Sequence, residues 1–133
     1  MPDAVIDTSA MIEVLTGNKP DETLRKRVQL SRLAAPEIFD LEAANVLRRL
    51  VRRGALRAAD ATEFLTDIGN APVARAPHRP LIERVWQLRH SVRAYDAAYL
   101  ALAEHLGVPL VTCDAKLAGS NGHRAEIELY PTS

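Results

Sequence analysis

Short, mostly apolar runs alternate with longer amphipathic stretches along the whole chain, and this alternation is the strongest constraint on its fold. The expected strands are the short runs at 3–7, 34–36, 72–76, 108–113 and 127–130. The expected helices, with apolar residues at helical spacing, are at 9–17, 20–33, 37–53, 57–70, 79–90 and 95–106. Strand–helix alternation with few hairpin signals predicts an α/β sandwich around a mainly parallel sheet.

Two of the expected strands end in an aspartate. The apolar residues 4–6 run into Asp7, and the run at 108–113, apolar almost throughout, runs into Asp114. Ligands of open α/β sheets bind beyond the carboxyl ends of the strands, so both carboxylates are expected at a functional edge of the sheet. The alternative role for Asp7 is to cap the helix that follows it.

Two further acids lie on helices that are expected to pack their apolar residues against the protein interior. Glu42 lies at the margin of the apolar arc of helix 37–53, and Asp96 lies at the start of helix 95–106. The second helix is apolar almost all round, which indicates that it is mostly buried. Asp40 is about 200° from Glu42 on the helical wheel and is therefore expected to lie outside any site that contains Glu42.

The candidate metal-binding residues are Asp7, Glu42, Asp96 and Asp114, called the four acids below. Carboxylates held close together raise each other's pKa, and a divalent cation relieves that repulsion. Oxygen ligands without His or Cys favour Mg²⁺ or Mn²⁺ over zinc, and such an ion activates water and stabilises charge on a phosphodiester. With Asp7 assigned to the metal, Thr8 or Ser9 is expected to cap the first helix.

A basic face borders the proposed acid cluster. Arg49 and Arg53 fall on the same side of their helix as Glu42, with Arg52 adjacent. Arginine binds phosphate in a bidentate manner, so these three residues are candidate RNA contacts. The alternative is a solvated, charge-balanced helix face. The formal net charge of zero, 17 acids against 17 Lys and Arg, argues neither for nor against a nucleic-acid partner.

Length and composition indicate one domain that spans residues 1–133. The sole cysteine, Cys113, cannot form an intramolecular disulfide. No stretch approaches the roughly 20 apolar residues of a membrane span, and the N-terminus lacks the pattern of a signal peptide. We therefore expect a cytoplasmic protein without a membrane contact.

Four short motifs together resemble the PIN-domain ribonucleases, and most closely the VapC-type toxins of toxin–antitoxin pairs. The motifs are Val5-Ile6-Asp7-Thr8-Ser9, the stretch Glu42 to Leu47, the helix Tyr95 to Ala103, and Thr112-Cys113-Asp114. Each motif alone is weak, but they occur in the right order and at typical spacing. The resemblance extends from residue 4 to about residue 118.

This resemblance implies a three-layer α/β/α fold and Mg²⁺- or Mn²⁺-dependent hydrolysis of RNA by a metal-activated water. It implies that the four acids bind the metal and act in catalysis, and that the chain forms a homodimer inhibited by a cognate VapB-type antitoxin. The residues that it assigns to supporting polar roles are Thr8, Ser9, Asn45 and Thr112.

Two other functions remain as alternatives. One is an aspartate-based phosphatase with Asp7 as nucleophile, although the haloacid-dehalogenase pattern needs a second acid two residues later, where this chain has Ser9. The other is a non-catalytic RNA-binding or protein-interaction domain. The presence of all four acids argues against the non-catalytic domain, and the missing second acid argues against the phosphatase.

Overall fold

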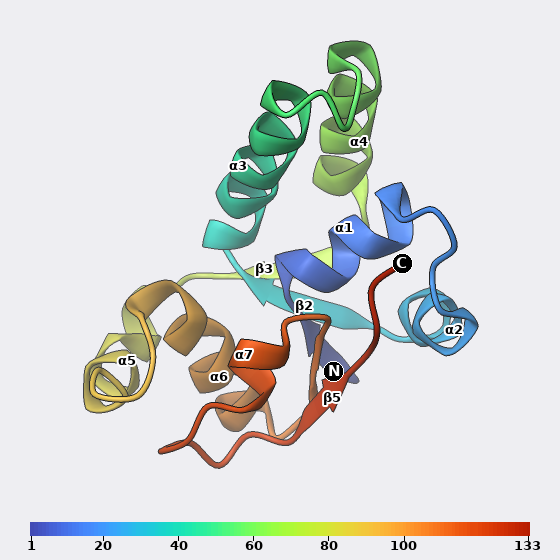
Figure 1. Ribbon diagram of the computed structural model, residues 1–133. Helices are drawn as coiled ribbons and strands as arrows, with labels where there is room; N and C mark the ends of the chain where they lie inside the picture. The colour runs from blue at the N-terminus through green and yellow to red at the C-terminus, as the bar shows by residue number, and fades with distance from the viewer.

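A computed structural model describes residues 1–133 and contains one sheet of five parallel strands (Figure 1). The strands are β1 (Ala4–Ile6), β2 (Leu33–Pro36), β3 (Val73–Ala76), β4 (Leu110–Thr112) and β5 (Ile127–Leu129). Their order across the sheet is β3-β2-β1-β4-β5, and every neighbouring pair is parallel. The predicted parallel sheet is therefore confirmed, and β1 and β4 are neighbours.

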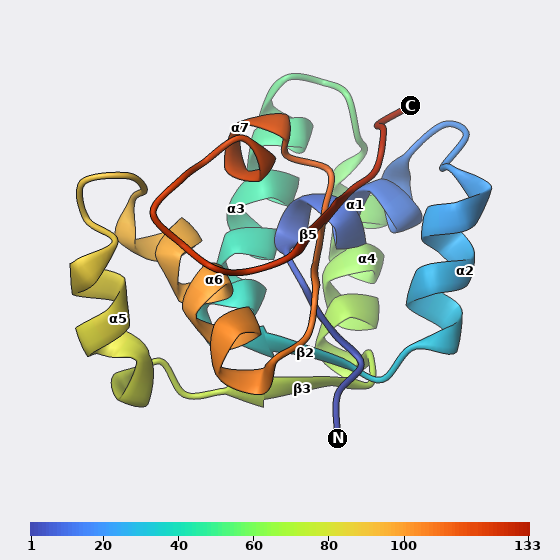
Figure 2. The same cartoon turned by 90° about the horizontal axis from the view of Figure 1, so that it is seen from below.

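Helices cover both faces of this sheet (Figures 1 and 2). They are α1 (Thr8–Thr16), α2 (Glu22–Leu30), α3 (Ile38–Arg52), α4 (Ala58–Asn70), α5 (Ile82–Gln87), α6 (Ala94–Leu106) and α7 (Ala115–Ala118). Right-handed crossovers place α1, α3 and α4 on one face, because β1, β2 and β3 progress in one direction. The return from β3 to β4 places α5 and α6 on the other face. This confirms the α/β/α layers.

The most buried helix is α6, as its all-round apolar sequence predicted. Seven consecutive residues, 97–103, are buried against the sheet. Tyr99 among them is one of the largest fully buried side chains, together with Phe39 from α3. The start of α6 is thus fixed firmly beneath the carboxyl ends of β1 and β4.

Two elements differ from the sequence prediction. The helix expected at 79–90 begins as a 3-10 turn, Arg79–Leu81, and continues as the short α5. Pro80, which lacks a backbone N–H, stands within that first turn. The four-residue α7 was not predicted and begins directly after Asp114. None of the helices combines the length and the apolar character that crossing a membrane would require.

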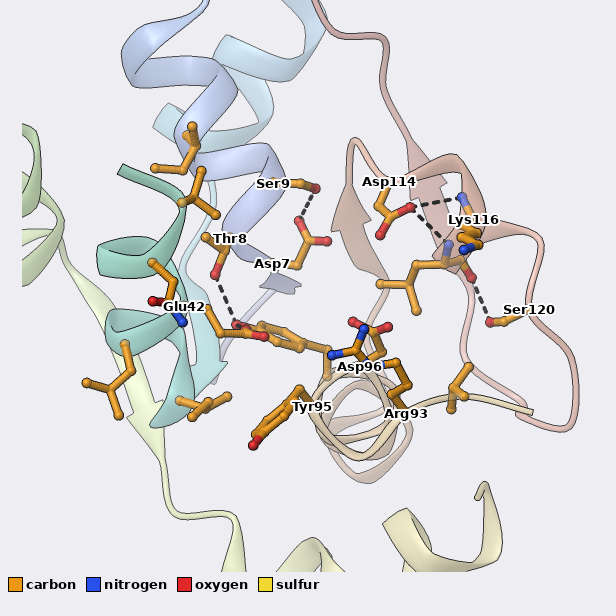
Figure 3. A pocket seen from close by; sticks show the side chains of 18 of the residues that line it. Asp7, Thr8, Ser9, Glu42, Arg93, Tyr95, Asp96, Asp114, Lys116 and Ser120 are labelled. Carbon is orange, nitrogen blue, oxygen red and sulfur yellow. Dashed lines mark hydrogen bonds between the residues drawn. The ribbon is translucent and has the colours of Figure 1, made fainter. Parts of the chain in front are cut away.

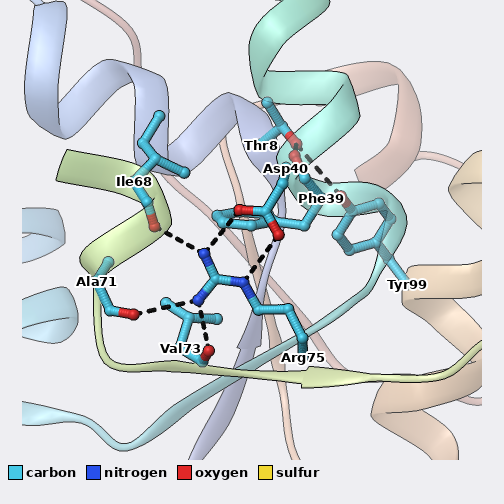
Figure 4. Close-up of polar contacts among 8 residues, drawn as sticks. All are labelled: Thr8, Phe39, Asp40, Ile68, Ala71, Val73, Arg75 and Tyr99. Carbon is cyan, nitrogen blue, oxygen red and sulfur yellow. Dashed lines mark hydrogen bonds and ion pairs between the residues drawn. The ribbon is translucent and has the colours of Figure 1, made fainter. Parts of the chain in front are cut away.

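Helices α3 and α4 form an antiparallel pair that projects from the sheet, and Arg75 of β3 fixes its base (Figure 4). The Arg75 guanidinium donates to both carboxylate oxygens of Asp40, at 3.0 and 2.7 Å. It also donates to the carbonyl oxygens of Ile68, Ala71 and Val73, and it lies 5.3 Å from the centre of the Phe39 ring. Asp40 is therefore paired with Arg75 and lies outside the site that contains Glu42, as expected.

Candidate metal centre

A cleft of about 1020 Å³ opens at the carboxyl ends of the strands (Figure 3). Most of its lining comes from α1, α3, α6 and α7 and from the turns that precede them, and Ser120 and Thr132 complete it. All four acids line it, each from a different element, together with the supporting residues Thr8, Ser9 and Asn45. Thr112, the fourth of those residues, lies directly behind Asp7.

Asp7 is the most buried of the four acids, with 6% of its surface exposed. Its Oδ1 accepts hydrogen bonds from Ser9 Oγ at 2.7 Å and from the Ala10 N–H at 3.0 Å. Its Oδ2 accepts from Thr112 Oγ1 at 2.5 Å. Burial outweighs these hydrogen bonds, and the charge of Asp114 adds to its effect, so the pKa of Asp7 rises from 3.8 to about 6.

Asp7 also caps α1, and the expectation that Thr8 or Ser9 would do so is wrong. Asp7 is the last residue with an extended backbone, and Thr8 is already helical. The cap position therefore falls on Asp7, whose Oδ1 meets the Ala10 N–H, while Ser9 donates to the same oxygen. Capping and a place in the cleft proved compatible roles for one carboxylate.

Glu42 reaches the cleft from α3 and is half-buried. The buried phenol of Tyr99 on α6 donates to Glu42 Oε1 at 2.6 Å. Tyr99 Oη also lies 3.2 Å from Thr8 Oγ1, so residues from three helices meet at this point. Burial and the charge of Asp96 raise the pKa of Glu42, although the Tyr99 hydrogen bond opposes them.

Asp96 and Asp114 stand on the opposite side of the cleft. Asp96 lies half-buried at the start of α6, and burial together with the charge of Asp114 raises its pKa. Asp114 follows β4, and its Oδ1 accepts from the backbone N–H groups of Lys116 and Leu117 at 2.9 and 3.2 Å. It therefore caps α7 as Asp7 caps α1, and the two adjacent strands end in the same way.

The donor chemistry of the cleft suits a hard divalent cation. None of the four acids forms an ion pair with a Lys or Arg side chain. Three of them have raised pKa values, in each case partly because of a neighbouring acid. No three His, Cys, Asp or Glu side chains of the structure lie close enough together to hold one metal ion between them. The residues thus fit a divalent ion by their oxygen donors and unbalanced charge rather than by preformed ligand distances.

Cationic side chains surround these acids at the mouth of the cleft. Arg49, Arg93 and Lys116 line the cleft, and their side chains form neither a hydrogen bond nor an ion pair. The charge of Arg93 lowers the pKa values of Glu42 and Asp96. Arg52 and Arg53, also candidate RNA contacts, are exposed farther along α3 and do not line the cleft.

Three residues of this site were missed from the sequence: Tyr99, Arg93 and Lys116. Two of them carry a simple signal, since Arg93 precedes Asp96 by three residues and Lys116 follows Asp114 by two. Tyr99 carries the signal of a buried aromatic one helical turn after Asp96, which indicates core packing as readily as a polar role.

Two exposed apolar side chains line the cleft. Leu41 on α3 is 68% exposed and Tyr95 on α6 is 55% exposed, and both line the cleft. Large apolar residues exposed beside a cavity mark a surface that binds another molecule.

Comparison with known proteins shows consistent similarity. Residues 4–119 match the PIN domain family. The chain is 38% identical over 125 residues to Ribonuclease VapC12 of Mycobacterium tuberculosis, which covers 94% of this chain and 97% of that protein. It is 40% identical over 137 residues to Ribonuclease VapC1 of the same organism, with 97% and 98% covered. The solved structure of PAE2754 from Pyrobaculum aerophilum superposes with a TM-score of 0.72 at 25% identity, covering 94% of this chain and 82% of that chain.

Proposed function

The chain belongs to the PIN-domain family and is a VapC-type ribonuclease toxin, and from this premise we propose that it cleaves RNA with Mg²⁺ or Mn²⁺ held by the four acids. The observation that carries the proposal is the cleft itself, which four carboxylates from four elements line without an ion pair to any Lys or Arg side chain. Neither the phosphatase nor the non-catalytic alternative finds support among the relatives. We propose residues 1–133 as one nuclease domain, supported by a single contiguous core.

The ligands of the proposed metal are Asp7, Glu42, Asp96 and Asp114. When bound, the ion lowers the pKa of water and stabilises charge on the phosphate oxygens. Ser9 and Thr112 hold the Asp7 carboxylate in one orientation through hydrogen bonds to its two oxygens. Thr112 Oγ1 also accepts the Asp114 N–H at 3.0 Å, which links the two strand-end acids. The orientation of these acids is therefore set before any ion arrives.

Substrate binding is assigned to the cations at the mouth of the cleft. Arg49, Arg93 and Lys116 have no protein partner, so their charges are free to bind the phosphates on either side of the cleaved bond. Arg52 and Arg53 extend this positive surface along α3, and Asn45 offers a neutral polar group beside it. Tyr95, exposed at the same mouth, offers an aromatic face for a base.

Replacement of Asp96 by Asn should remove a ligand without disturbing the fold, because the Asp96 side chain forms no hydrogen bond in the protein. We expect RNA cleavage to fall by at least about 100-fold. We also expect the rise in melting temperature that Mn²⁺ or Mg²⁺ causes in the unsubstituted protein to shrink. Cleavage of a labelled RNA and thermal unfolding with and without each ion measure the two effects.

The control for this experiment is Asp67→Asn, which changes an exposed acid on α4 outside the cleft. It should retain both cleavage and the response to metal. Cleavage that continues after complete removal of divalent ions by EDTA would contradict the proposed chemistry.

Replacement of Arg49 by Gln should weaken RNA binding and leave the chemical step nearly unchanged. We expect KM to rise severalfold at moderate salt, and the slope of log affinity against log salt to fall by about one, since one phosphate contact is lost. Arg25→Gln on α2, which lies outside the cleft, is the matched loss of charge. Equal effects from both substitutions would show that only net charge matters.

The proposed partner is a VapB-type antitoxin, since this chain is a VapC-type toxin. The exposed apolar side chains of Leu41 and Tyr95, which line the cleft, support a peptide contact there. We also propose a homodimer, which sedimentation of the purified chain would measure. Because the proposed substrate is cellular RNA, we propose that the protein acts in the cytoplasm.

A further inference from the structure

We infer that Tyr99 is a positioning residue that fixes the Glu42 carboxylate for metal binding. This inference rests on the proposed metal site and assigns to that site a residue beyond its acids. Tyr99 does not touch the ion in this proposal and acts through Glu42.

The contact between the two side chains is short and shielded from water. Tyr99 is 2% exposed, and its hydroxyl lies 2.6 Å from Glu42 Oε1. The pKa of the Tyr99 phenol is raised above its ordinary value, chiefly by burial, so it stays protonated and donates the hydrogen bond. On its other side, Tyr99 Oη lies 3.2 Å from Thr8 Oγ1, which is itself 3.4 Å from the Phe39 carbonyl oxygen.

Glu42 needs such a contact more than the two strand-end acids do. Asp7 and Asp114 are short side chains fixed by hydrogen bonds from their own helix starts. Glu42 has a longer side chain on the projecting α3, and its only hydrogen bond within the protein is the one from Tyr99. Without that bond the carboxylate would sample several rotamers, and each bound ion would have to order it.

The contact also leaves one oxygen of Glu42 without a partner. Oε1 is held by the phenol, whereas Oε2 makes no hydrogen bond within the protein and remains available to an ion. Partners that orient a metal ligand from behind typically contribute 10- to 100-fold to metal affinity or activity. Tyr99 has the burial, the distance and the donor chemistry for this role.

The test is Mn²⁺ binding by the full chain, measured as free Mn²⁺ by electron paramagnetic resonance, with Tyr99→Phe. We expect the dissociation constant for Mn²⁺ to rise about tenfold or more. RNA cleavage should fall at low Mn²⁺ and recover at high Mn²⁺. In a Glu42→Gln background, Tyr99→Phe should add little, because the two residues act through one contact.

The matched control is Tyr130→Phe, which removes another hydrogen bond from a phenol to a carboxylate. Tyr130 donates to Glu128 Oε1 at 3.1 Å, and neither residue lines the cleft. Its Mn²⁺ affinity should equal that of the unsubstituted protein.

The possible results distinguish failure of the metal site from failure of the role of Tyr99. If the unsubstituted protein binds no Mn²⁺, the proposed metal site fails and this inference fails with it. If the unsubstituted protein and a folded Tyr99→Phe bind Mn²⁺ equally, only the role of Tyr99 is overturned. Should Tyr99→Phe not fold, Thr8→Val decides, since it removes the hydroxyl on the other side of the phenol: weaker Mn²⁺ binding supports the inference, and unchanged binding overturns it.

Discussion

Replacement of Asp7 by Asn is expected to abolish RNA cleavage and, at the same time, to stabilise the metal-free protein at pH 7. The two effects have one cause. Asp7 is almost fully buried, and its pKa in the folded protein is about 6, against 3.8 as the ordinary value. The folded chain therefore holds a charge that it would be more stable without.

The direction of the pH dependence follows from that raised pKa. Between pH 3.8 and about 6 the folded protein binds a proton at Asp7 that the unfolded chain has released. Stability consequently falls as pH rises through this window, and above pH 6 the full penalty remains. The rise of the Asp7 pKa from 3.8 to about 6 corresponds to a penalty of about 3 kcal/mol.

Asparagine removes this penalty and keeps most of the hydrogen bonds. Its amide oxygen accepts from Ser9 and the Ala10 N–H in place of Oδ1, and its NH₂ group can donate to Thr112 Oγ1. Allowing for imperfect replacement, we expect a gain of about 2 kcal/mol, or roughly 7 °C in melting temperature. Urea unfolding of metal-free protein from pH 5 to 8 measures it.

Two controls make this prediction specific. Asp67→Asn, an exposed acid, should leave both stability and cleavage unchanged. Added Mn²⁺ should stabilise the unsubstituted protein and not Asp7→Asn, which reverses their order of stability. If Asp7→Asn were less stable than the unsubstituted protein at every pH, the contribution of the carboxylate as a helix cap would exceed the cost of burying its charge.

Replacement of Arg75 by Met is expected to cause the largest loss of stability in the chain outside the core. The Arg75 side chain is 20% exposed, and its guanidinium donates to Asp40 and to three backbone carbonyl groups. Methionine keeps much of the volume but leaves the Asp40 carboxylate without a partner and takes one donor from each carbonyl group, of which Ile68 and Ala71 keep a backbone N–H donor. We expect this loss to cost about 2–4 kcal/mol. Urea unfolding followed by circular dichroism measures the loss.

The comparison variant is Arg57→Met, which breaks a pair of similar geometry at the surface. Arg57 donates to both oxygens of Asp60, but its side chain is 81% exposed. Exposed pairs contribute little, so its unfolding should match that of the unsubstituted protein. Equal losses from Arg75→Met and Arg57→Met would refute the idea that Arg75 fixes the base of the α3–α4 pair.

The strand-end acids and the buried helix were predictable because each depends on local sequence. Asp7 and Asp114 follow apolar runs, and in a parallel sheet such ends lie at one edge whenever the strands are neighbours. Glu42 required one further step, its place on a helical wheel. The same local reasoning missed that Asp7 could serve as both cap and site residue, since it treated these roles as exclusive.

The remaining features depend on contacts between distant parts of the chain. Tyr99 meets Glu42 across 57 residues, and Arg75 meets Asp40 across 35. Each sequence position is compatible with an ordinary core aromatic or a solvated arginine. Only the strand order, which brings β3 beside β2 and places α6 under β1, determines these partners.

The projecting α3–α4 pair is an arm that is attached at its base and free at its tip. The attachment, called the clamp, is the contact of Arg75 with Asp40, and the tip is the turn at Gly54, where the backbone takes φ of 72°. Helix α3 has 15 residues, so the arm is about 22 Å long. Glu42 lies only two residues from the clamp. Because displacement of such an arm grows with distance from its fixed end, a load on the tip moves Gly54 far and Glu42 hardly at all. We therefore expect the tip to accept an insertion or a fused tag while the spacing of the four acids is preserved.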